Sequence, residues 1–223
     1  MSCHAQVEDR VAAARARSEV LVRERFAKAG VAYPAEELFL RAFKREAVIE
    51  VWARGAEDRL RLIQTYAWTV NSGQPGPKRR QGDLQIPEGF YQIDAFNPQS
   101  RFHLSLRVNY PNASDLVRSD PEKPGFDIYI HGNEVSVGCL ALGDAAIEEV
   151  YLMALDARNR ETISAHIFPA RMQGPEWDKL RATHPALAPF WAELQPGFDA
   201  FERTQRVPRV TVEEDGRYVV TAE

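Results

Sequence analysis

A histidine and a cysteine lie eight positions apart in the stretch IYIHGNEVSVGCLAL, residues 128–142. Cysteine attacks a carbonyl carbon as its thiolate, and its ordinary pKa of about 8.5 leaves only a few per cent ionised near neutral pH. A turn through residues 132–134 would fold His131 back toward Cys139. The two residue types therefore suit a nucleophile and its general base.

The residues around Cys139 favour a tight loop. Gly138 permits a sharp backbone turn just before the cysteine, after which the amides of Gly138 and Cys139 would point at one oxyanion. Ser136 is the nearest hydroxyl, and we expect it to hold this bend or to assist the oxyanion. The predicted catalytic residues are therefore Cys139, His131, Ser136 and Gly138.

Two other interpretations of these side chains stay open at this point. Cys139 can be a small buried apolar residue beside a hydrogen-bonded histidine. Alternatively, His131, Cys139 and His166 can bind zinc, although no closely paired Cys or His motif supports that. Our own expectation is that the protein uses no metal and no cofactor. The second cysteine, Cys3, lies at the N-terminus, where a structural disulfide to Cys139 is not expected.

The apolar pattern predicts an α+β fold, mostly antiparallel and β-rich, that positions these loops. Helical spacing over 8–29 indicates an N-terminal helix ended by Gly30, and Asp144 is expected to cap a helix that runs to about residue 158. Residues 71–87 and 111–125 read as a long loop and a turn-rich segment. We also expect a β-hairpin of strands 38–43 and 47–53, and further strands at 60–70, 102–110, 127–130 and 163–168, with one more that begins at residue 89. Helical pieces are expected over 187–194 and 198–201, interrupted at Pro196-Gly197. The tail over 207–220 is expected to form a weak hairpin or to fray.

The strand expected at 102–110 has a polar face that borders either solvent or the wall of a cleft. Its apolar and polar residues alternate, as they do in a half-buried strand. The apolar positions are Phe102, Leu104, Leu106 and Val108, and the polar positions are His103, Ser105, Arg107 and Asn109.

Composition excludes several functional classes. The 223 residues are 44% hydrophobic and 27% charged, which is ordinary for one ample globular domain. A net charge of −4, with one compact basic run at 78–80, argues against nucleic-acid binding. No apolar stretch is long enough to span a bilayer. The first residues lack the pattern of a signal peptide, so the protein is either cytoplasmic or an exported protein shown without its export signal.

Several motifs occur together in a fixed order. They are Gly76-Pro77-Lys78, Gly82-Asp83, PEGFY at 87–91, Phe96-Asn97-Pro98, FHLSLRVNYPN at 102–112, HGNEVSVGCLAL at 131–142 and HIFPARM at 166–172. Together they resemble the L,D-transpeptidase catalytic (YkuD-type) domain family, and more narrowly its YafK-like branch, over roughly residues 60–201. The family's signature is His-Gly, then Ser or Thr, a variable residue, Gly and Cys. This sequence matches it at 131–132 and 136–139. It departs in its short His–Cys spacing and in having Leu140-Ala141-Leu142 where an arginine often follows the cysteine.

The resemblance implies a β-rich L,D-transpeptidase-like domain with an N-terminal helix and C-terminal helices. We expect an N-terminal extension of helix and hairpin over 1–58, packed on a catalytic domain at 59–205, followed by a tail at 206–223. It also implies a cell-wall cysteine enzyme located in the periplasm or cell envelope. Its partners would be peptidoglycan stem peptides and, by extension, a wall-attached lipoprotein.

In that interpretation Cys139 forms a thioester at the L-centre of meso-diaminopimelate, and His131 takes up the thiol proton. An amine then completes L,D-transpeptidation, or water completes an amidase reaction that releases a wall-attached protein or amino acid. The alternative is a non-catalytic peptidoglycan-binding or scaffold module with the same fold. The residues expected to bind substrate are Gly132, Tyr110, Asn109, His166, Arg171 and Lys78.

Overall fold

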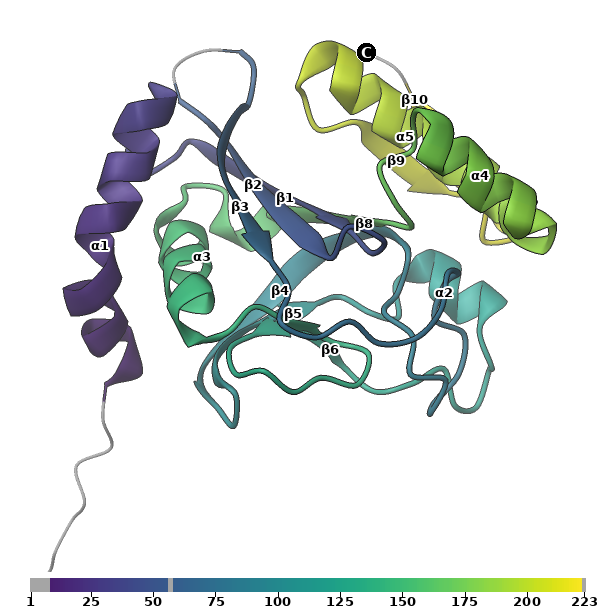
Figure 1. Cartoon of the computed structure of the whole chain (residues 1–223), viewed down its shortest axis with the longest axis horizontal. Coiled ribbons are helices and arrows are strands. Elements are labelled where there is room, and N and C mark those ends of the chain that lie inside the picture. The colour runs from purple at the N-terminus through teal and green to yellow at the C-terminus, as the bar shows by residue number, and fades with distance from the viewer. Residues whose placement is uncertain (1–8, 56–57, 222–223) are drawn as a thin grey trace, which may run out of the picture.

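The structure is a computed structural model that describes residues 9–55 and 58–221, so Cys3 lies outside the described residues. Within those ranges one eight-stranded sheet forms the centre, in the order β3-β2-β1-β8-β4-β5-β6-β7 (Figure 1). Its strands are antiparallel neighbours except for the parallel pairs β1–β8 and β6–β7. The strands are β1 (Glu37–Phe43), β2 (Val48–Arg54), β3 (Arg61–Ala67), β4 (Gly89–Ser100), β5 (His103–Val108), β6 (Ile128–His131), β7 (Leu140–Ala141) and β8 (Ser164–Phe168), with a separate hairpin of β9 (Arg209–Val212) and β10 (Tyr218–Thr221).

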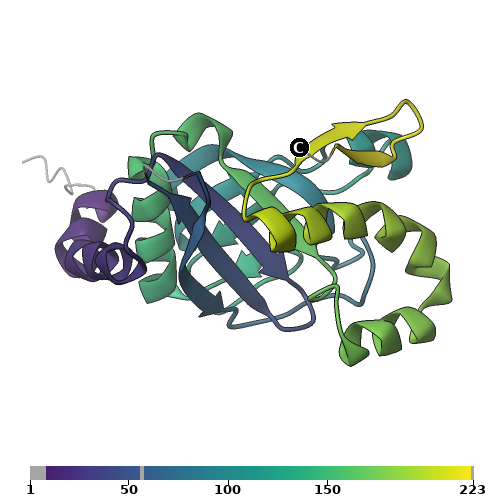
Figure 2. The same ribbon diagram turned by 90° about the horizontal axis from the view of Figure 1, so that it is seen from above.

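Helices cover both faces of this sheet, which confirms the predicted α+β class. The N-terminal helix α1 lies beside α3, and the C-terminal helices lie on the other side of the sheet with the hairpin (Figures 1 and 2). The larger core joins α1 and α3 to one sheet face through residues such as Phe26, Leu40, Leu106 and Val150. A second core joins the C-terminal helices to the opposite face. The helices are α1 (Arg10–Ala29), α2 (Ala113–Arg118), α3 (Asp144–Asp156), α4 (Pro175–Thr183) and α5 (Ala188–Thr204), with short 3₁₀ turns η1 (Arg160–Thr162) and η2 (Pro185–Leu187).

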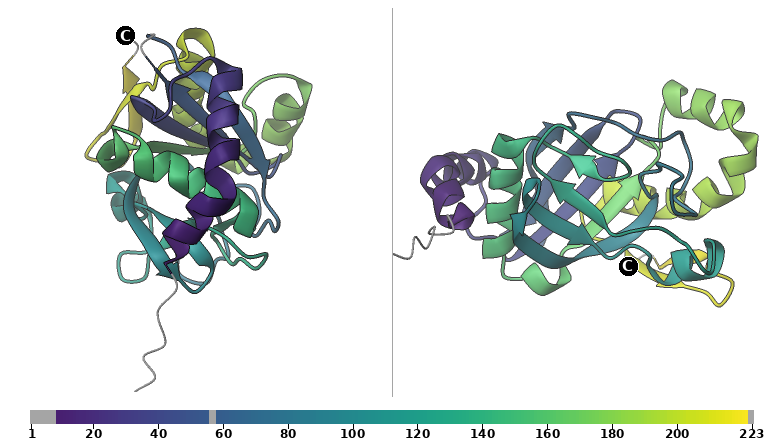
Figure 3. Two further views of the ribbon diagram at one scale, coloured as in Figure 1. Left: turned by 90° about the vertical axis from the view of Figure 1, so that its left-hand side faces the viewer. Right: turned by 90° about the horizontal axis from the view of Figure 1, so that it is seen from below.

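The predicted N-terminal helix is present. The carboxylate of Asp9 accepts hydrogen bonds from the first helical amides, and Gly30 ends the helix at φ +67°, where glycine is favoured. Ion pairs fix α1 against α3, including Arg15–Asp156 at 2.5 Å. Figure 3 shows the two helices side by side.

A buried lysine ties the long loop 71–87 to the sheet. Lys44 follows β1, and its Nζ donates to the carbonyl oxygens of Gly76 and Ile86 at 2.7 and 2.9 Å. It also pairs with the fully buried carboxylate of Glu88 at 2.9 Å, which in turn accepts from Trp191 Nε1. A loop without secondary structure is thereby held at several points against the rigid sheet.

Two helices were missed by the sequence analysis. The turn-rich segment contains α2, whose N-cap Asn112 forms a reciprocal capping box with Asp115. The helix α4 begins with Pro175 at its first position. Both are short, so neither presents enough repeats for periodicity to reveal it.

The predicted break at Pro196-Gly197 is wrong, because α5 continues through it. Proline removes one amide donor from a helix, but α5 buries a continuous apolar face that includes Trp191, Leu194 and Phe198. Gly197 has a packing reason, since a Cβ there would lie 2.6 Å from the ring of Phe90. The tail forms the β9–β10 hairpin.

The predicted cap of α3 is also wrong. Gly143, not Asp144, occupies the N-cap position. Asp144 instead accepts a hydrogen bond from the amide of Asn133 at 2.7 Å. Its carboxylate therefore fastens the loop that leaves His131.

Candidate active site

His131 is the last residue of β6 and is almost completely buried, at 1% exposure. Its Nδ1 lies 2.5 Å from the carbonyl oxygen of Gly132, and its ring packs 4.7 Å from that of Phe102. A carbonyl oxygen can only accept, so we assign the Nδ1–H tautomer, which leaves Nε2 as the basic nitrogen. Burial lowers the pKa of His131, which keeps the imidazole neutral.

Gly132 makes this position of the histidine feasible. A Cβ at residue 132 would lie 2.6 Å from Asp144 Oδ1 and 2.9 Å from the carbonyl oxygen of Phe102. Only glycine fits here without displacing its neighbours. Gly132 therefore contributes by allowing the backbone to pass close to Asp144 and Phe102.

Cys139 comes immediately before β7 and is partly exposed. The parallel register pairs Ile130 with Leu140 and His131 with Ala141, so continuing it by one residue places Cys139 beside Tyr129. The Tyr129 amide does donate to the cysteine Sγ, at 3.4 Å. Because side chains alternate along a strand, residues 129 and 131 of β6 share one face, and the thiol lies against that face.

The two backbone amides of the loop near the thiol each donate a hydrogen bond to a hydroxyl group. The amide of Gly138 donates to Ser72 Oγ at 2.8 Å, and the amide of Cys139 donates to Ser136 Oγ at 3.0 Å. The sequence analysis aimed these two amides at an oxyanion, and that prediction is wrong for this conformation. They hold the bend of the loop instead, and Gly138 supports it with φ +88°.

The imidazole and the thiol share no hydrogen bond anywhere in the described ranges. Burial raises the pKa of the Cys139 thiol, although the Tyr129 amide and the positive charge of Lys78 lower it in part. Burial also lowers the pKa of His131. Both groups are therefore neutral at rest, and a catalytic proton transfer between them requires closer approach, as often happens when a substrate binds.

Lys78 lies close enough for its charge to act on the cysteine. It is 5% exposed, and its Nζ pairs with Asp83 at 2.6 Å and donates to the carbonyl oxygen of Arg80. Tyr110 is its neighbour, with the ring centroid 5.9 Å from the ammonium and the hydroxyl donating to Pro124. The structure therefore brings Tyr110 together with Lys78, whose charge acts on the Cys139 thiol.

Asn109, His166 and Arg171 lie farther from Cys139. Asn109 Oδ1 accepts from the amide of Gln92. His166, on β8, packs between Phe39 and Phe90, and Arg171 pairs with Glu50 at 2.6 Å. Strands β4, β5 and β6 separate β8 from β7, so His166 is not a neighbour of the thiol.

The zinc interpretation is wrong for His131, Cys139 and His166. Across residues 9–55 and 58–221, no cluster of three or more His, Cys, Asp or Glu side chains has a metal-binding arrangement. In the same ranges no helix is both long and apolar enough to cross a bilayer.

The sequence analysis missed Ser72 and Tyr129 as contributors to this site. Ser72 is contributed by a loop with no periodicity, 66 residues before the amide that it binds. Tyr129 acts through its backbone amide, which residue type does not reveal. The available signals were that Tyr129 lies two residues before His131 and that Ser72 lies in the long loop 71–87.

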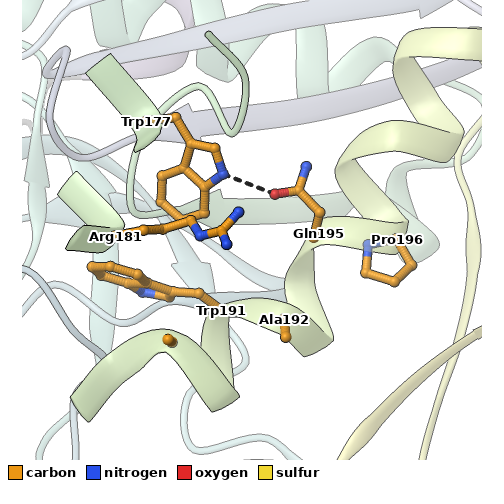
Figure 4. Close-up of a pocket in the computed structure, with 7 residues that line it drawn as sticks. Trp177, Arg181, Trp191, Ala192, Gln195 and Pro196 are labelled. Carbon is orange, nitrogen blue, oxygen red and sulfur yellow. Dashed lines mark hydrogen bonds between the residues drawn. The ribbon is translucent and has the colours of Figure 1, made fainter. Parts of the chain in front are cut away.

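An apolar cavity of about 230 Å³ lies between α4 and α5 (Figure 4), and Cys139 is not among the residues that line it. Trp177 and Trp191 line it, and Trp177 Nε1 donates to Gln195 at 2.9 Å. Neither indole N–H is left without a partner, since that of Trp191 binds Glu88. The described residues that line this cavity include no nucleophile and no general base.

Known proteins similar to this chain identify its family. The family model described as the YkuD L,D-transpeptidase catalytic domain matches residues 44–163. A provisionally named L,D-transpeptidase, YafK of Escherichia coli (strain K12), is 32% identical over 188 residues, which cover 82% of this chain and 74% of YafK. This chain belongs to the L,D-transpeptidase catalytic domain family. The matched range contains His131 and Cys139 and ends before His166 and Arg171.

Solved structures agree with this L,D-transpeptidase fold. The helical cell shape determining protein Pgp2 from Campylobacter jejuni aligns with a TM-score of 0.50 at 16% identity, covering 86% of this chain and 80% of Pgp2. A mutant form of Pgp2 gives a TM-score of 0.50 at 18% identity and covers 80% of this chain. The present chain spans 64% of the length of that mutant structure. At these identities the similarity concerns the fold alone.

Proposed function

We propose that this protein is a cysteine acyltransferase or amidase that acts on peptidoglycan stem peptides in the cell envelope. Family membership supports the class of reaction. The observation that carries the proposal is the position of the Cys139 thiol, partly exposed at the Tyr129 amide and on the strand face that ends in His131. A nucleophile needs access to substrate and a base within reach, and this arrangement supplies the access and a short path to the base.

The proposed reaction begins from a neutral Cys139 thiol and a neutral His131 imidazole. When substrate closes the site, the thiol proton passes to Nε2 of His131, because the Gly132 carbonyl oxygen engages Nδ1. The thiolate attacks the carbonyl carbon at the L-centre of diaminopimelate, the imidazolium protonates the departing amine, and a thioester remains on Cys139. An incoming amine gives transpeptidation, and water gives release of a wall-attached lipoprotein or an amino acid.

Oxyanion stabilisation requires a donor that is not already engaged. The Gly138 and Cys139 amides are bonded to hydroxyl groups in the resting state. We infer that the Tyr129 amide, directed at the sulfur, moves to the developing oxyanion as the carbon–sulfur bond forms.

A product assay distinguishes the two outcomes of the thioester. Purified muropeptides are incubated with the protein, with and without a D-amino acid acceptor, and the products are separated by mass. Exchange products identify a transpeptidase, and truncated products in both samples identify an amidase. Unchanged muropeptides under both conditions would contradict the proposal.

One observation favours a second candidate, a non-catalytic peptidoglycan-binding module. The resting imidazole and thiol are not bonded, and burial raises the pKa of the thiol. Such a module would show the slow alkylation of an ordinary buried cysteine. Rapid alkylation of Cys139 at neutral pH, lost in His131→Ala, would exclude it.

A further inference from the structure

Two opposite charges lie beside the nucleophile on the polar face of strands β5 and β6. Arg107 on β5 pairs in register with Tyr129 on β6, and such cross-strand partners project from the same face of a sheet. The Cys139 thiol lies against that face, because it accepts from the Tyr129 amide. The Tyr129 hydroxyl donates to Asp127 Oδ2 at 3.1 Å. The polar face of the strand expected at 102–110 therefore borders the candidate active site.

Each of these two charged side chains keeps one atom for a ligand. Arg107 uses Nε and Nη2 for a bidentate pair with Asp94, at 2.8 and 3.1 Å, and among the described residues its Nη1 makes no hydrogen bond. Asp127 accepts through Oδ2, and within the same ranges its Oδ1 makes none. The side chains of Arg107 and Asp94 are 39% and 36% exposed, so their pair contributes little to stability. The guanidinium is therefore open to a second carboxylate.

The carboxylate of Asp127 lies within electrostatic range of both the sulfur and the guanidinium. Burial raises the pKa of the Cys139 thiol, and the negative charge of Asp127 adds to that rise. Asp94 raises the pKa of Arg107, and Asp127 raises it further. A ligand bound at the thiol therefore meets an anion and a cation on the same sheet face. This pair of charges is complementary to a group that carries both an ammonium and a carboxylate.

Diaminopimelate carries such a group at the end away from its reacting carbonyl. The carbonyl carbon belongs to the L-centre, and the D-centre bears a free ammonium and a free carboxylate. Five carbon–carbon bonds of about 1.5 Å join the two, an extended span of about 6 Å. The sulfur lies 3.4 Å from the Tyr129 amide, and β5 lies about 4.8 Å beyond β6, so about 8 Å separates the sulfur from the Arg107 backbone. The long side chain of Arg107 covers the remaining distance.

We propose that Arg107 and Asp127 recognise the zwitterionic D-centre of diaminopimelate and so determine which stem peptide the protein accepts. The inference rests on the proposed function and adds the residues that fix its specificity. Arg107 Nη1 donates to the carboxylate of the ligand, and Asp127 Oδ1 accepts from its ammonium. L-Lysine is the same residue with hydrogen in place of that carboxylate. A lysine stem peptide therefore keeps the contact with Asp127 and loses the contact with Arg107.

Peptide binding to the whole chain carrying Cys139→Ala, measured by calorimetry, tests this pair without requiring catalysis. The matched ligands are two stem tetrapeptides that differ only in having meso-diaminopimelate or L-lysine at the third position. We expect the diaminopimelate peptide to bind about tenfold more tightly, the value of one charge-assisted hydrogen bond. Equal affinity for the two peptides would overturn the assignment.

Variants in the same background separate the two contacts. Arg107→Gln should weaken binding of the diaminopimelate peptide about tenfold and leave the Kd of the lysine peptide unchanged, which also shows that the variant is folded. Asp127→Asn should weaken binding of both peptides, and it decides the test if Arg107→Gln does not fold. Arg101→Gln removes an exposed positive charge from the turn between β4 and β5 and should change neither Kd. An unchanged preference in Arg107→Gln, or unchanged binding in Asp127→Asn, would contradict the roles assigned to them.

Intact-mass measurement of the wild-type chain with the same two peptides separates this inference from the proposed function. Acylation of Cys139 by both peptides at equal rates overturns only the specificity assignment and leaves the enzyme. A preference in binding without acylation by either peptide supports the recognition pair and removes the enzymatic proposal.

Discussion

Ser136 bonds both backbone polar groups of Cys139. Its hydroxyl donates to the cysteine carbonyl oxygen at 2.6 Å and accepts from the cysteine amide at 3.0 Å. This side chain closes a turn whose other amide, that of Gly138, is held by Ser72. The position of the sulfur at the Tyr129 amide thus depends on two hydroxyls from separate segments.

Removing the Ser136 hydroxyl should impair acylation more than stability. Ser136→Ala loses two hydrogen bonds, which lowers the free energy of unfolding by about 1–3 kcal/mol. A displacement of the sulfur of about 1 Å should slow acylation by stem peptide about 10²-fold. Denaturant unfolding and the acylation rate measure the two effects. Ser136→Thr keeps a hydroxyl and should restore most of the rate, and equal rates in wild type and Ser136→Ala would contradict the positioning role.

Gly138 combines an unfavourable backbone angle with close contact. Its φ is +88°, and a Cβ added at this position would lie 3.1 Å from the Gln85 carbonyl oxygen. Gly138→Ala should therefore lower the free energy of unfolding by about 1–2 kcal/mol, the cost of the left-handed conformation for a residue with a Cβ. The rate of acylation should also fall, because the loop shifts. Gly174→Ala is the matched control, with φ +79° and open space around the added Cβ. If both variants retain wild-type acylation, the bend before Cys139 does not position the nucleophile.

The charge of Lys78 should be measurable in the reactivity of Cys139. Since this ammonium lowers the pKa of the thiol, Lys78→Met should raise that pKa further and slow alkylation at neutral pH. The pH–rate profile of iodoacetamide alkylation reports the shift. Lys78→Arg keeps the charge, and Lys123→Met removes an exposed one. Identical profiles for wild type and Lys78→Met would show that the charge does not act on the sulfur.

His166 should make the folded state sensitive to acid. Burial lowers the pKa of His166 from 6.5 to about 3 in the folded protein. Between pH 6.5 and about pH 3 the imidazole is therefore protonated in the unfolded chain and neutral in the folded chain. Stability is retained above pH 6.5 and falls as the pH decreases toward 3. In His166→Phe this loss is absent, so the difference in unfolding free energy between pH 7 and pH 4 should be smaller than in wild type. An unchanged difference would mean that the imidazole is protonated in the folded state.

The sequence predicted the parts of the site that depend on local chain geometry. The short strand before His131, the glycines and Ser136 lie within a few residues of Cys139, and their types restrict the loop directly. Ser72 could not be found this way, because its contact with Gly138 depends on the anchoring of loop 71–87 by Lys44 and Glu88. Likewise, Pro196 predicts a helix break from local chemistry, but the burial of one face of α5 outweighs the lost hydrogen bond.

Intact-mass measurement after incubation with a stem tetrapeptide tests the central claim most directly. The account predicts a covalent adduct with the mass of the acyl portion, present in wild type, absent in Cys139→Ala and strongly reduced in His131→Ala. No adduct in wild type, or an adduct that persists in Cys139→Ala, would contradict the assignment of Cys139 as the nucleophile.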